Sequence, residues 1–316
     1  MQSEKVFIGV DIGGTKVAAG LVSSKGEIAR IDRVPMVSHS SAGAGLESVL
    51  SAIARVSPDA RARIDGIGIC APGPLDPATG VILNPPNLPC WRNFPLAEAL
   101  QKKHAVHVKI DNDANAAALA ETRWGAARGY KFVFYATIGT GIGTGIVIDE
   151  KIYHGRTGSA AEGGHVSIDY RGPVCRCGKP GCIEIFASGP AIAKRAQERL
   201  AAGCRSSMLS LAAGRADAVT GEVIGQAYAD GDELAKELLT ETSDRLALWL
   251  SNMVDLIDPE VMVIGGGAAI LYQPFLDFIR EKTAKLSVNP RAREVPIVSA
   301  RYGADSGIAG GAALCA

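Results

Sequence analysis

The sequence predicts an α/β protein with two domains, on three observations. The chain has 316 residues, which is enough for two domains of ordinary size. Apolar runs of strand length alternate with longer segments whose apolar residues recur at helical spacing. Two units of strand, glycine-rich turn and strand lie about half a chain apart, at 5–22 and 131–148. This repetition suggests two related halves that face one ligand.

The first unit predicts a β-hairpin whose turn could bind a phosphate. The apolar run 5–10 leads into Asp11, and a second apolar run begins at position 17. The turn between them contains Gly13, Gly14, Thr15 and Lys16. Such a turn offers backbone N–H groups, a hydroxyl and an ammonium group to an anion, and Asp11 could hold a metal ion through water. An ordinary hairpin is the alternative, because Gly-Gly is a common turn.

Between the two units the chain predicts a helix, a strand and a rigid loop. Apolar residues recur at helical spacing over 45–55, and 64–70 reads as a buried strand. The next segment, 71–96, contains seven prolines, which prevent regular strand pairing and fix an irregular surface. A rigid loop after a core strand can contact a ligand, or it can be a simple ordered connection.

A strand predicted at 106–110 ends in a cluster of acidic and amide side chains. Asp111, Asn112, Asp113 and Asn115 stand within five positions, and an alanine-rich helix follows them. One of these residues is explained as the N-cap of that helix. Capping does not explain the cluster as a whole. A carboxylate at a strand end beside a helix N-terminus is well placed to act on a ligand.

The second strand–turn–strand unit repeats the first pattern. The apolar run 131–138 precedes a turn rich in glycine and threonine, and another apolar run follows at 146–148. The turn residues expected to contact a phosphate are Gly139, Thr140, Gly141, Gly143, Thr144 and Gly145. A third cluster follows an apolar strand at 261–264 and consists of Gly265, Gly266 and Gly267. The sequence has no Walker P-loop pattern, and neither cluster gives G-x-G-x-x-G, which disfavours those two kinds of nucleotide site.

The segment 161–189 predicts a zinc site. Three of the seven cysteines, Cys175, Cys177 and Cys182, fall within eight residues, and His165 precedes them by ten positions. Thiolate and imidazole are preferred zinc ligands, and four of them close a tetrahedral structural site that has no open position for chemistry. The alternative is three ordinary reduced thiols and a surface histidine. The histidines without such neighbours are expected to be surface residues: His104, His107 and His154.

The remaining third of the chain is predicted to be mostly helical. Helices are expected at 191–200, 232–257 and 274–286, and Pro259 ends the second of these. A strand at 295–300 and a helix at 306–313 close the chain.

Composition excludes several classes of protein. Basic and acidic residues balance at 33 each, and no run of Lys and Arg occurs, so a nucleic-acid partner is not expected. No apolar run approaches membrane-spanning length, and the first residues lack the apolar stretch of a signal peptide. The other cysteines are scattered singly, as is usual in a reducing compartment. We therefore expect a cytoplasmic protein that does not bind membranes.

The motifs together resemble one family. The patterns E-x-G-H at 162–165, C-x-C-x-x-x-x-C at 175–182 and E-x-x-A-S-G at 184–189 are similar to the signature of the ROK family of sugar kinases and related repressors. The D-N-D-A-N run at 111–115 and the two glycine turns agree with it. The resemblance covers nearly the whole chain from Asp11 onward. The segments P-N-L-P-C-W and C-I-E-I-F-A-S-G look most like its bacterial glucokinase branch.

The resemblance implies the two-domain actin-like ATPase and sugar-kinase fold, which is ribonuclease H-like and has a cleft between its domains. The expected small N-terminal α/β domain is 1–112, with the closing helix 305–316 packed back on it. The expected large α/β domain is 113–304, with the zinc-binding loop at 165–182. The repressors of the family carry an added N-terminal helix-turn-helix domain, for which the position of Asp11 leaves no room. Relatives usually form homodimers or homotetramers.

The resemblance also implies roles for residues. Asp113 would be the catalytic base, and the glycine turns would hold ATP with its Mg²⁺ ion, with Gly265–Gly267 at the adenosine. Zinc would fix a loop that aims Glu162 and Glu184 at one pocket, and His165 could bond a sugar hydroxyl through its second nitrogen. The residues implied to bind sugar are Gly73, Asn87, Asn112, Asp113, Glu162, His165 and Glu184.

The activity that the resemblance implies is phosphorylation of a hexose by ATP, with glucose to glucose 6-phosphate, a reaction of glycolysis, as the first expectation. N-acetylglucosamine, N-acetylmannosamine and fructose are the alternative sugars, and a sugar sensor without catalysis is an alternative class. The presence of Asp113 argues against the sensor. The sequence does not distinguish ATP from polyphosphate as the phosphate donor, and it does not define the oligomer or any regulation.

Overall fold

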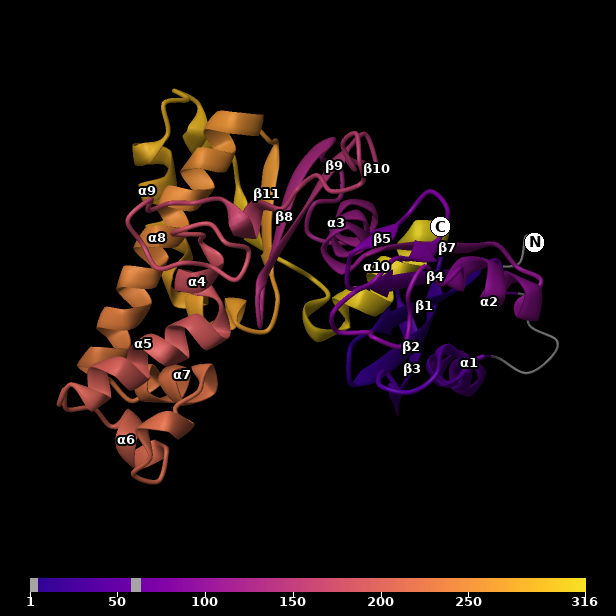
Figure 1. Cartoon of the computed structure of the whole chain (residues 1–316). Helices are drawn as coiled ribbons and strands as arrows, with labels where there is room; N and C mark the ends of the chain where they lie inside the picture. Colours follow the sequence, from indigo (N-terminus) through magenta and orange to yellow (C-terminus); the bar gives the residue numbers. More distant parts are fainter. Residues whose placement is uncertain (1–4, 58–63) are drawn as a thin grey trace. The chain divides into compact units, whose positions relative to one another are not determined.

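The computed structural model describes residues 5–57 and 64–316 (Figure 1). The chain folds into two compact units. The first unit contains the described residues up to Tyr135, together with Gly145–Ala161 and Ala300–Ala316. The second unit contains Ala136–Thr144 and Glu162–Ser299.

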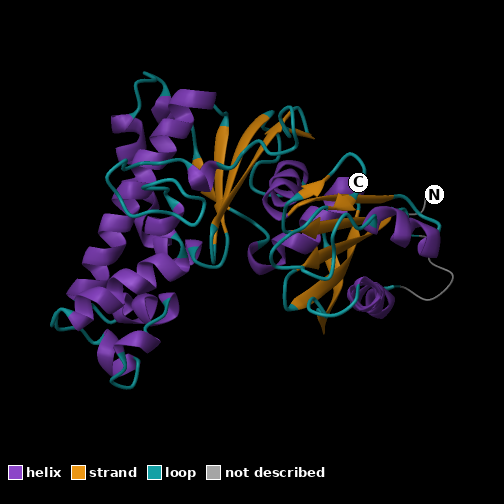
Figure 2. Cartoon of the chain, viewed as in Figure 1, coloured by secondary structure: helices purple, strands orange, loops and turns teal. Residues whose placement is uncertain are grey.

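A five-stranded sheet forms the centre of the first unit, in the order β3-β2-β1-β4-β7 (Figure 2). The strands β1 (Val6–Ile12), β2 (Lys16–Ser23) and β3 (Ile28–Pro35) are antiparallel, as the predicted hairpin requires. The strands β4 (Gly66–Ala71) and β7 (Val108–Asn112) run parallel to β1. Every residue of β4 is buried, which is expected for a parallel strand covered on both faces.

One face of this sheet packs on α1 (Ala42–Val56) and α2 (Leu96–His104), and the other packs on α3 (Asp113–Arg123) and α10 (Ser306–Cys315). The last helix lies very close to the strands. A Cβ atom added at Gly9 would lie 1.8 Å from the carbonyl oxygen of Ile308, and one added at Gly68 would lie 1.7 Å from that of Gly311. Only glycine in the strands allows α10 to pack this closely.

The second sheet has the order β10-β9-β8-β11-β12. Its strands are β8 (Phe132–Ile138), β9 (Ile142–Ile148), β10 (Lys151–Ile152), β11 (Val261–Gly265) and β12 (Ile297–Ser299). The two remaining strands, β5 (Leu75–Asp76) and β6 (Val81–Ile82), form a short antiparallel pair inside the proline-rich segment. The prolines therefore leave room for a small ladder that the sequence did not predict.

Helices make up most of the second unit (Figure 2). They are α4 (Glu184–Ala187), α5 (Gly189–Ala201), α6 (Met208–Leu211), α7 (Gly221–Ala229), α8 (Glu233–Ile257) and α9 (Leu276–Leu286). The side chain of Asp232 caps α8, and Asp258 ends it in the left-handed conformation just before Pro259. Its 3₁₀ helices are η1 (Gly163–His165), η2 (Ala216–Ala218), η3 (Ala269–Phe275) and η4 (Ala292–Glu294), and η5 (Gly303–Asp305) belongs to the first unit.

The predicted α/β class is confirmed, and three local predictions are corrected. The helix expected from 274 begins as an α-helix only at Leu276, after the 3₁₀ turn η3 that contains Pro274. The closing strand is shorter than 295–300. The second glycine turn contains only 139–141, because Gly143, Thr144 and Gly145 lie in β9. The domain boundaries expected from the sequence stay a prediction.

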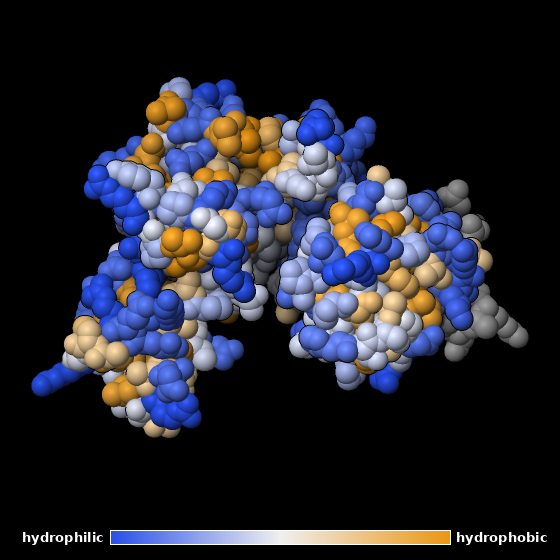
Figure 3. Space-filling model, viewed as in Figure 1, coloured by the Kyte–Doolittle hydropathy of each residue, from blue (hydrophilic) through white to orange (hydrophobic). Residues whose placement is uncertain are grey.

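No helix in the described part of the chain is both long enough and apolar enough to cross a membrane. The face shown in Figure 3 is mostly hydrophilic, with scattered apolar patches.

Candidate active site and metal centre

The first glycine turn closes the β1–β2 hairpin as predicted. The N–H of Gly13 donates to the carbonyl oxygen of Lys16 over 2.9 Å, and Thr15 and Lys16 are exposed. A Cβ atom added at Gly14 would lie 2.9 Å from the main-chain oxygen of Asn87. The fold therefore brings Asn87, which the resemblance implied as a sugar-binding residue, next to the turn implied for the phosphates. Gly73 is exposed in the same proline-rich segment.

Asp11 lies near the end of β1, just before this turn. Burial, and then the negative charge of Asp113, raise the pKa of Asp11 to about 6, against the opposing effects of Lys16 and Arg33. Its carboxylate lies against the first turn of α10, where a Cβ atom on Gly307 would be 2.4 Å from the Asp11 carboxyl carbon. A carboxylate whose charge is disfavoured in this way would gain from a nearby cation.

The Asp-Asn-Asp segment joins β7 to α3. Asn112 is the N-cap of α3, and its side-chain oxygen accepts the N–H of Ala114 over 2.9 Å. The exposed carboxylate of Asp113 accepts the same N–H over 2.8 Å. Asp111 is buried at the end of β7. The predicted capping role therefore belongs to Asn112, and two carboxylates remain for other roles.

His154 was expected to be an ordinary surface residue, and this expectation is wrong. Its Nε2 atom lies 2.7 Å from Oδ2 of the buried Asp111, and this hydrogen bond raises the pKa of the imidazole. His104 is also half-buried, and burial lowers the pKa of its imidazole, while His107 is exposed as expected. No local sequence pattern could have identified the pairing of His154, because Asp111 is 43 positions away.

The second glycine turn has a carboxylate that comes from elsewhere in the chain. The N–H of Ile142, which follows the turn, donates to Oε2 of Glu184 over 2.9 Å. A Cβ atom added at Gly141 would lie 2.5 Å from the same oxygen, so glycine is needed for this approach. The N–H of Gly189 donates to the carbonyl oxygen of Gly139 over 2.8 Å. Both ends of the E-x-x-A-S-G motif are therefore bound to the second turn.

The third glycine cluster contacts β8 just before the second glycine turn. Gly266 has a φ of +92°, and a Cβ atom there would lie 2.4 Å from the carbonyl oxygen of Ile138, the last residue of β8. The N–H of Ala268 donates to that oxygen over 2.9 Å. Gly265 ends β11, and Gly267 has no heavy atom within 4 Å of an added Cβ.

Thr144 does not belong to the turn. It is buried in β9, and its hydroxyl oxygen accepts the N–H of Gly163 over 2.8 Å. Gly163 begins the short η1 turn, which contains His165 and is preceded by the exposed Glu162. Trp249 of α8 donates its indole N–H to the carbonyl oxygen of Gly163 over 3.0 Å. These bonds fix the main chain that carries Glu162 and His165.

The fold brings together His165, Cys175, Cys177 and Cys182, whose ligand atoms all lie within 4.8 Å of one another. The Nδ1 atom of His165 is 3.7 Å from the sulfur of Cys175, and the sulfurs of Cys177 and Cys182 are 3.6 Å apart. Ligands around a tetrahedral zinc ion are separated by about 3.5–3.8 Å, given metal–ligand bonds of about 2.0–2.3 Å. The His165–Cys175 and Cys177–Cys182 distances fit a four-coordinate zinc ion.

The chemistry of the cluster also favours a cation. Burial raises the pKa of the Cys182 thiol to about 12, while the N–H of Lys179 lowers that of Cys177. Three thiolates this close repel one another unless a metal ion offsets their charge. Since Nδ1 of His165 faces the sulfurs, its Nε2 is the nitrogen that remains for another partner.

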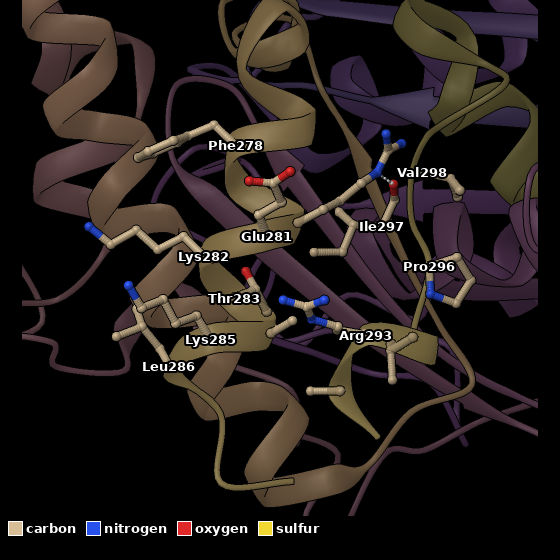
Figure 4. Close-up of a pocket in the computed structure, with 14 residues that line it drawn as sticks. Phe278, Glu281, Lys282, Thr283, Lys285, Leu286, Arg293, Pro296, Ile297 and Val298 are labelled. Atoms are coloured by element: carbon tan, nitrogen blue, oxygen red, sulfur yellow. Dashed lines mark hydrogen bonds between the residues drawn. The ribbon is translucent and has the colours of Figure 1, made fainter. Parts of the chain in front are cut away.

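A cavity of about 970 Å³ in the second unit lies between α9 and the segment 292–298 (Figure 4). No residue predicted to bind substrate, nucleotide or zinc lines it. Its arginine and lysine side chains are partly paired, since Arg280 bonds the carbonyl oxygen of Ile297 and Lys282 bonds Asp244. We therefore base the candidate site on the chemistry of the glycine turns and carboxylates and not on this groove.

The model of the ROK family matches residues 7–316. A glucokinase of Streptomyces coelicolor is 34% identical over 312 residues, which cover 97% of this chain and 96% of that protein. An N-acetylmannosamine kinase of Salmonella typhi is 30% identical over 307 residues, which cover 97% of each protein. The crystal structure of a ROK family glucokinase from Streptomyces griseus, in complex with glucose and AMPPNP, has a TM-score of 0.83 at 34% identity and covers 98% of both chains. The chain therefore belongs to the ROK family.

Proposed function

We propose that this chain is an ATP-dependent sugar kinase whose preferred substrate is glucose, which it converts to glucose 6-phosphate. The observation that carries the proposal is the 34% identity to a glucokinase over nearly the full length of both proteins. The solved relative that holds glucose and AMPPNP together supports a sugar and a nucleotide as the two ligands.

Phosphoryl transfer requires a base for the attacking hydroxyl, neutralisation of phosphate charge and alignment of the two substrates. We assign the base to Asp113, whose carboxylate is exposed at the N-terminus of α3. Asn112 and Asn87, with Gly73, would bind the sugar from the first unit. The proximity of Asn87 to Gly14 supports their assignment to neighbouring parts of one ligand site.

The nucleotide would bind at the glycine turns. The first turn offers Gly13, Gly14, Thr15 and Lys16, and Asp11 would hold Mg²⁺ through water. In the second unit Gly266 lies against Ile138, the residue just before the turn 139–141, which supports a phosphate contact followed by an adenosine contact. Thr140 is the exposed side chain of this turn. Thr144 is not retained as a direct phosphate ligand, because its hydroxyl is buried in β9 and bonded to Gly163.

Zinc would be structural, because four protein ligands leave no open position on the ion. The zinc ion would fix the loop between Glu162 and Glu184. Glu162 is exposed, and among the described residues Glu184 accepts the N–H of Ile142 through Oε2, so both carboxylates retain acceptor positions for sugar hydroxyls. The Nε2 atom of His165 would provide a third contact.

A second candidate is phosphorylation of an N-acylhexosamine. The 30% identity to an N-acetylmannosamine kinase, over 97% of both chains, favours it as the nearest alternative. The two candidates share every assignment above and differ only in the group accepted at carbon 2 of the sugar.

A steady-state comparison of four sugars tests the proposal. Glucose, N-acetylglucosamine, N-acetylmannosamine and fructose are each supplied with ATP and Mg²⁺, and kcat/KM is measured through ADP release. We expect glucose to give the highest value. An acylated hexosamine in first place would establish the second candidate, and fructose in first place would contradict both.

Three further measurements complete this test. Replacing ATP with polyphosphate determines the phosphate donor, and ATP is expected to be preferred. Calorimetric binding of glucose without any ADP release would identify a sugar sensor and would contradict catalysis. Size-exclusion chromatography with light scattering tests the expected homodimer or homotetramer.

A further inference from the structure

The hydrogen bond between His154 and Asp111 joins two distant parts of the first unit. Asp111 is the fourth of five residues in β7, and its side chain is 5% exposed. His154 follows β10, and its side chain is 32% exposed. The main-chain oxygen of His154 accepts the N–H of Ala160 over 3.1 Å, which anchors the loop that carries it.

Asp111 uses its second carboxylate oxygen to hold the start of α3. Oδ1 accepts the N–H of Asn112 over 2.7 Å and the side-chain N–H of Asn115 over 3.1 Å. These two donors stand on either side of Asp113 in the sequence. The buried carboxylate therefore bonds His154 with one oxygen and brackets Asp113 with the other.

We propose that His154 is a positioning residue for the proposed catalytic base: by bonding Oδ2 of Asp111, it orients the carboxylate whose Oδ1 fixes Asn112 and Asn115 around Asp113. The role in turnover rests on the proposed function of Asp113, whereas the coupling between His154 and the start of α3 does not.

The physical reason is the burial of Asp111. A carboxylate that is 5% exposed needs its oxygens bonded, because an unsatisfied buried charge is strongly unfavourable. Without the imidazole, Oδ2 would lose this partner, and the side chain would rotate toward the neighbouring cavity of about 690 Å³. This rotation would weaken the bonds from Oδ1 to Asn112 and Asn115.

Other charged groups line this cavity together with His154. Lys109 of β7, Arg123 of α3 and Lys151 of β10 line it, with Arg156 from the His154 loop. The acidic groups are Asp76 of β5 and Glu150, which lies 3.7 Å from Arg123. Among the described residues, Asp111 is the group that hydrogen-bonds the ring of His154. Burial of the ring opposes protonation of His154, and its bond to Asp111 favours it.

The first test is hydrogen exchange of the full-length protein. Three variants are compared with the wild type. His154→Ala removes the hydrogen bond to Asp111, and His154→Gln keeps an N–H donor at a similar reach. The control, His107→Ala, changes an exposed histidine just before β7, the strand that carries Asp111. We expect the amides of 112–115 to exchange about tenfold faster in His154→Ala and at the wild-type rate in the other two variants. Unchanged exchange in His154→Ala overturns the proposal, whatever the protein phosphorylates.

The second test is kinetic. In His154→Ala we expect kcat to fall about tenfold while KM for ATP stays within about twofold, because the base is displaced and the nucleotide turns are not. His154→Gln should restore most of kcat. If the wild type is active and His154→Ala keeps its full kcat, the positioning role is overturned. If the wild type phosphorylates none of the four sugars, the proposed function fails, and hydrogen exchange still decides the coupling.

A measurement on the wild type covers the case in which His154→Ala does not fold. The imidazole of His154 is titrated by NMR, and a pKa above the ordinary value of about 6.5 is expected from its bond to Asp111. A pKa at or below about 6.5 overturns the proposal, because the bonded pair would then be absent in solution.

Discussion

The two glycine turns have similar sequences but depend on different surroundings. The first follows a strand that carries its own carboxylate, Asp11, two residues before Gly13. The second has no carboxylate of its own, and Glu184 from α4 accepts the N–H that follows it. Since Glu184 lies two residues after Cys182, the second turn is linked to the proposed metal centre through Glu184. Loss of zinc should therefore disturb the second turn selectively.

The largest effect is expected in the first unit, from Asp113→Asn. The amide cannot accept the proton of the sugar hydroxyl, so kcat should fall by about 10²–10⁴-fold while glucose still binds. Steady-state kinetics and glucose calorimetry measure the two quantities. Asp149→Asn is the matched control, since Asp149 is an exposed carboxylate with a φ of +48°, which Asn tolerates. Near-normal turnover of Asp113→Asn would remove Asp113 from the role of base.

The next effect is expected in the second unit, from Cys177→Ser. Loss of one thiolate should release zinc and loosen the loop that carries Glu162 and Glu184, so that Kd for glucose rises about tenfold or more. Metal analysis and calorimetry measure this on one preparation. Cys204→Ser, at an exposed cysteine outside the cluster, should change neither quantity. Stoichiometric zinc together with full activity in Cys177→Ser would contradict the scaffolding role.

Asp11→Asn tests the carboxylate beside the first glycine turn through its effect on the stability of the protein. The folded-state pKa of Asp11 is raised from 3.8 to about 6, so the folded protein binds this proton more tightly than the unfolded chain does. The stability of the wild type should therefore fall as pH rises from about 4 to about 6, and the ionised carboxylate remains unfavourable above that range. Without Mg²⁺ and nucleotide, Asp11→Asn should be more stable than the wild type at pH 7.5 by about 1–3 kcal/mol.

Urea denaturation at two pH values measures this difference. The extra stability of Asp11→Asn over the wild type should shrink at pH 5, because Asp11 of the wild type is itself largely protonated there. Asp11→Asn should also lose affinity for the Mg²⁺ nucleotide. If Asp11→Asn were less stable than the wild type at pH 7.5, the fold would stabilise the ionised carboxylate of Asp11, and the prediction would be wrong.

The smallest effect is expected from Glu184, where two variants separate the turn from the sugar. Glu184→Ala removes the acceptor for the N–H of Ile142, and KM for ATP and for glucose should each rise by about tenfold. Glu184→Gln keeps an oxygen acceptor, so KM for ATP should recover while KM for glucose stays raised. If Gln restores both constants equally, the charge of Glu184 has no part in binding sugar.

Strong local patterns predicted much of the fold. The β1–β2 hairpin, the long helix α8 that ends before Pro259, and the Cys/His cluster each have enough local signal to be identified. The proline-rich segment was predicted as irregular, and it is irregular apart from β5 and β6. These features need no knowledge of distant partners.

The wrong predictions concern residues whose role depends on a contact with a residue far away in the sequence. Gly145 looks like a turn residue, but a Cβ atom there would lie 2.8 Å from the carbonyl oxygen of Ala114, so this glycine serves the packing of α3 on β9. Thr144 looks like a phosphate ligand, but its hydroxyl is committed to Gly163. His154 has no informative neighbours in sequence, and its partner Asp111 comes from another strand.

The most direct test of the proposed kinase activity is the stoichiometry of the reaction with glucose. The protein is incubated with ATP, Mg²⁺ and glucose, and both ADP and glucose 6-phosphate are quantified over time. We predict one ADP for each glucose 6-phosphate, with neither product formed when glucose is omitted, and with both formed about 10²–10⁴-fold more slowly when Asp113 is replaced by Asn. Release of ADP without any sugar phosphate, or glucose binding with no product at all, would contradict the account.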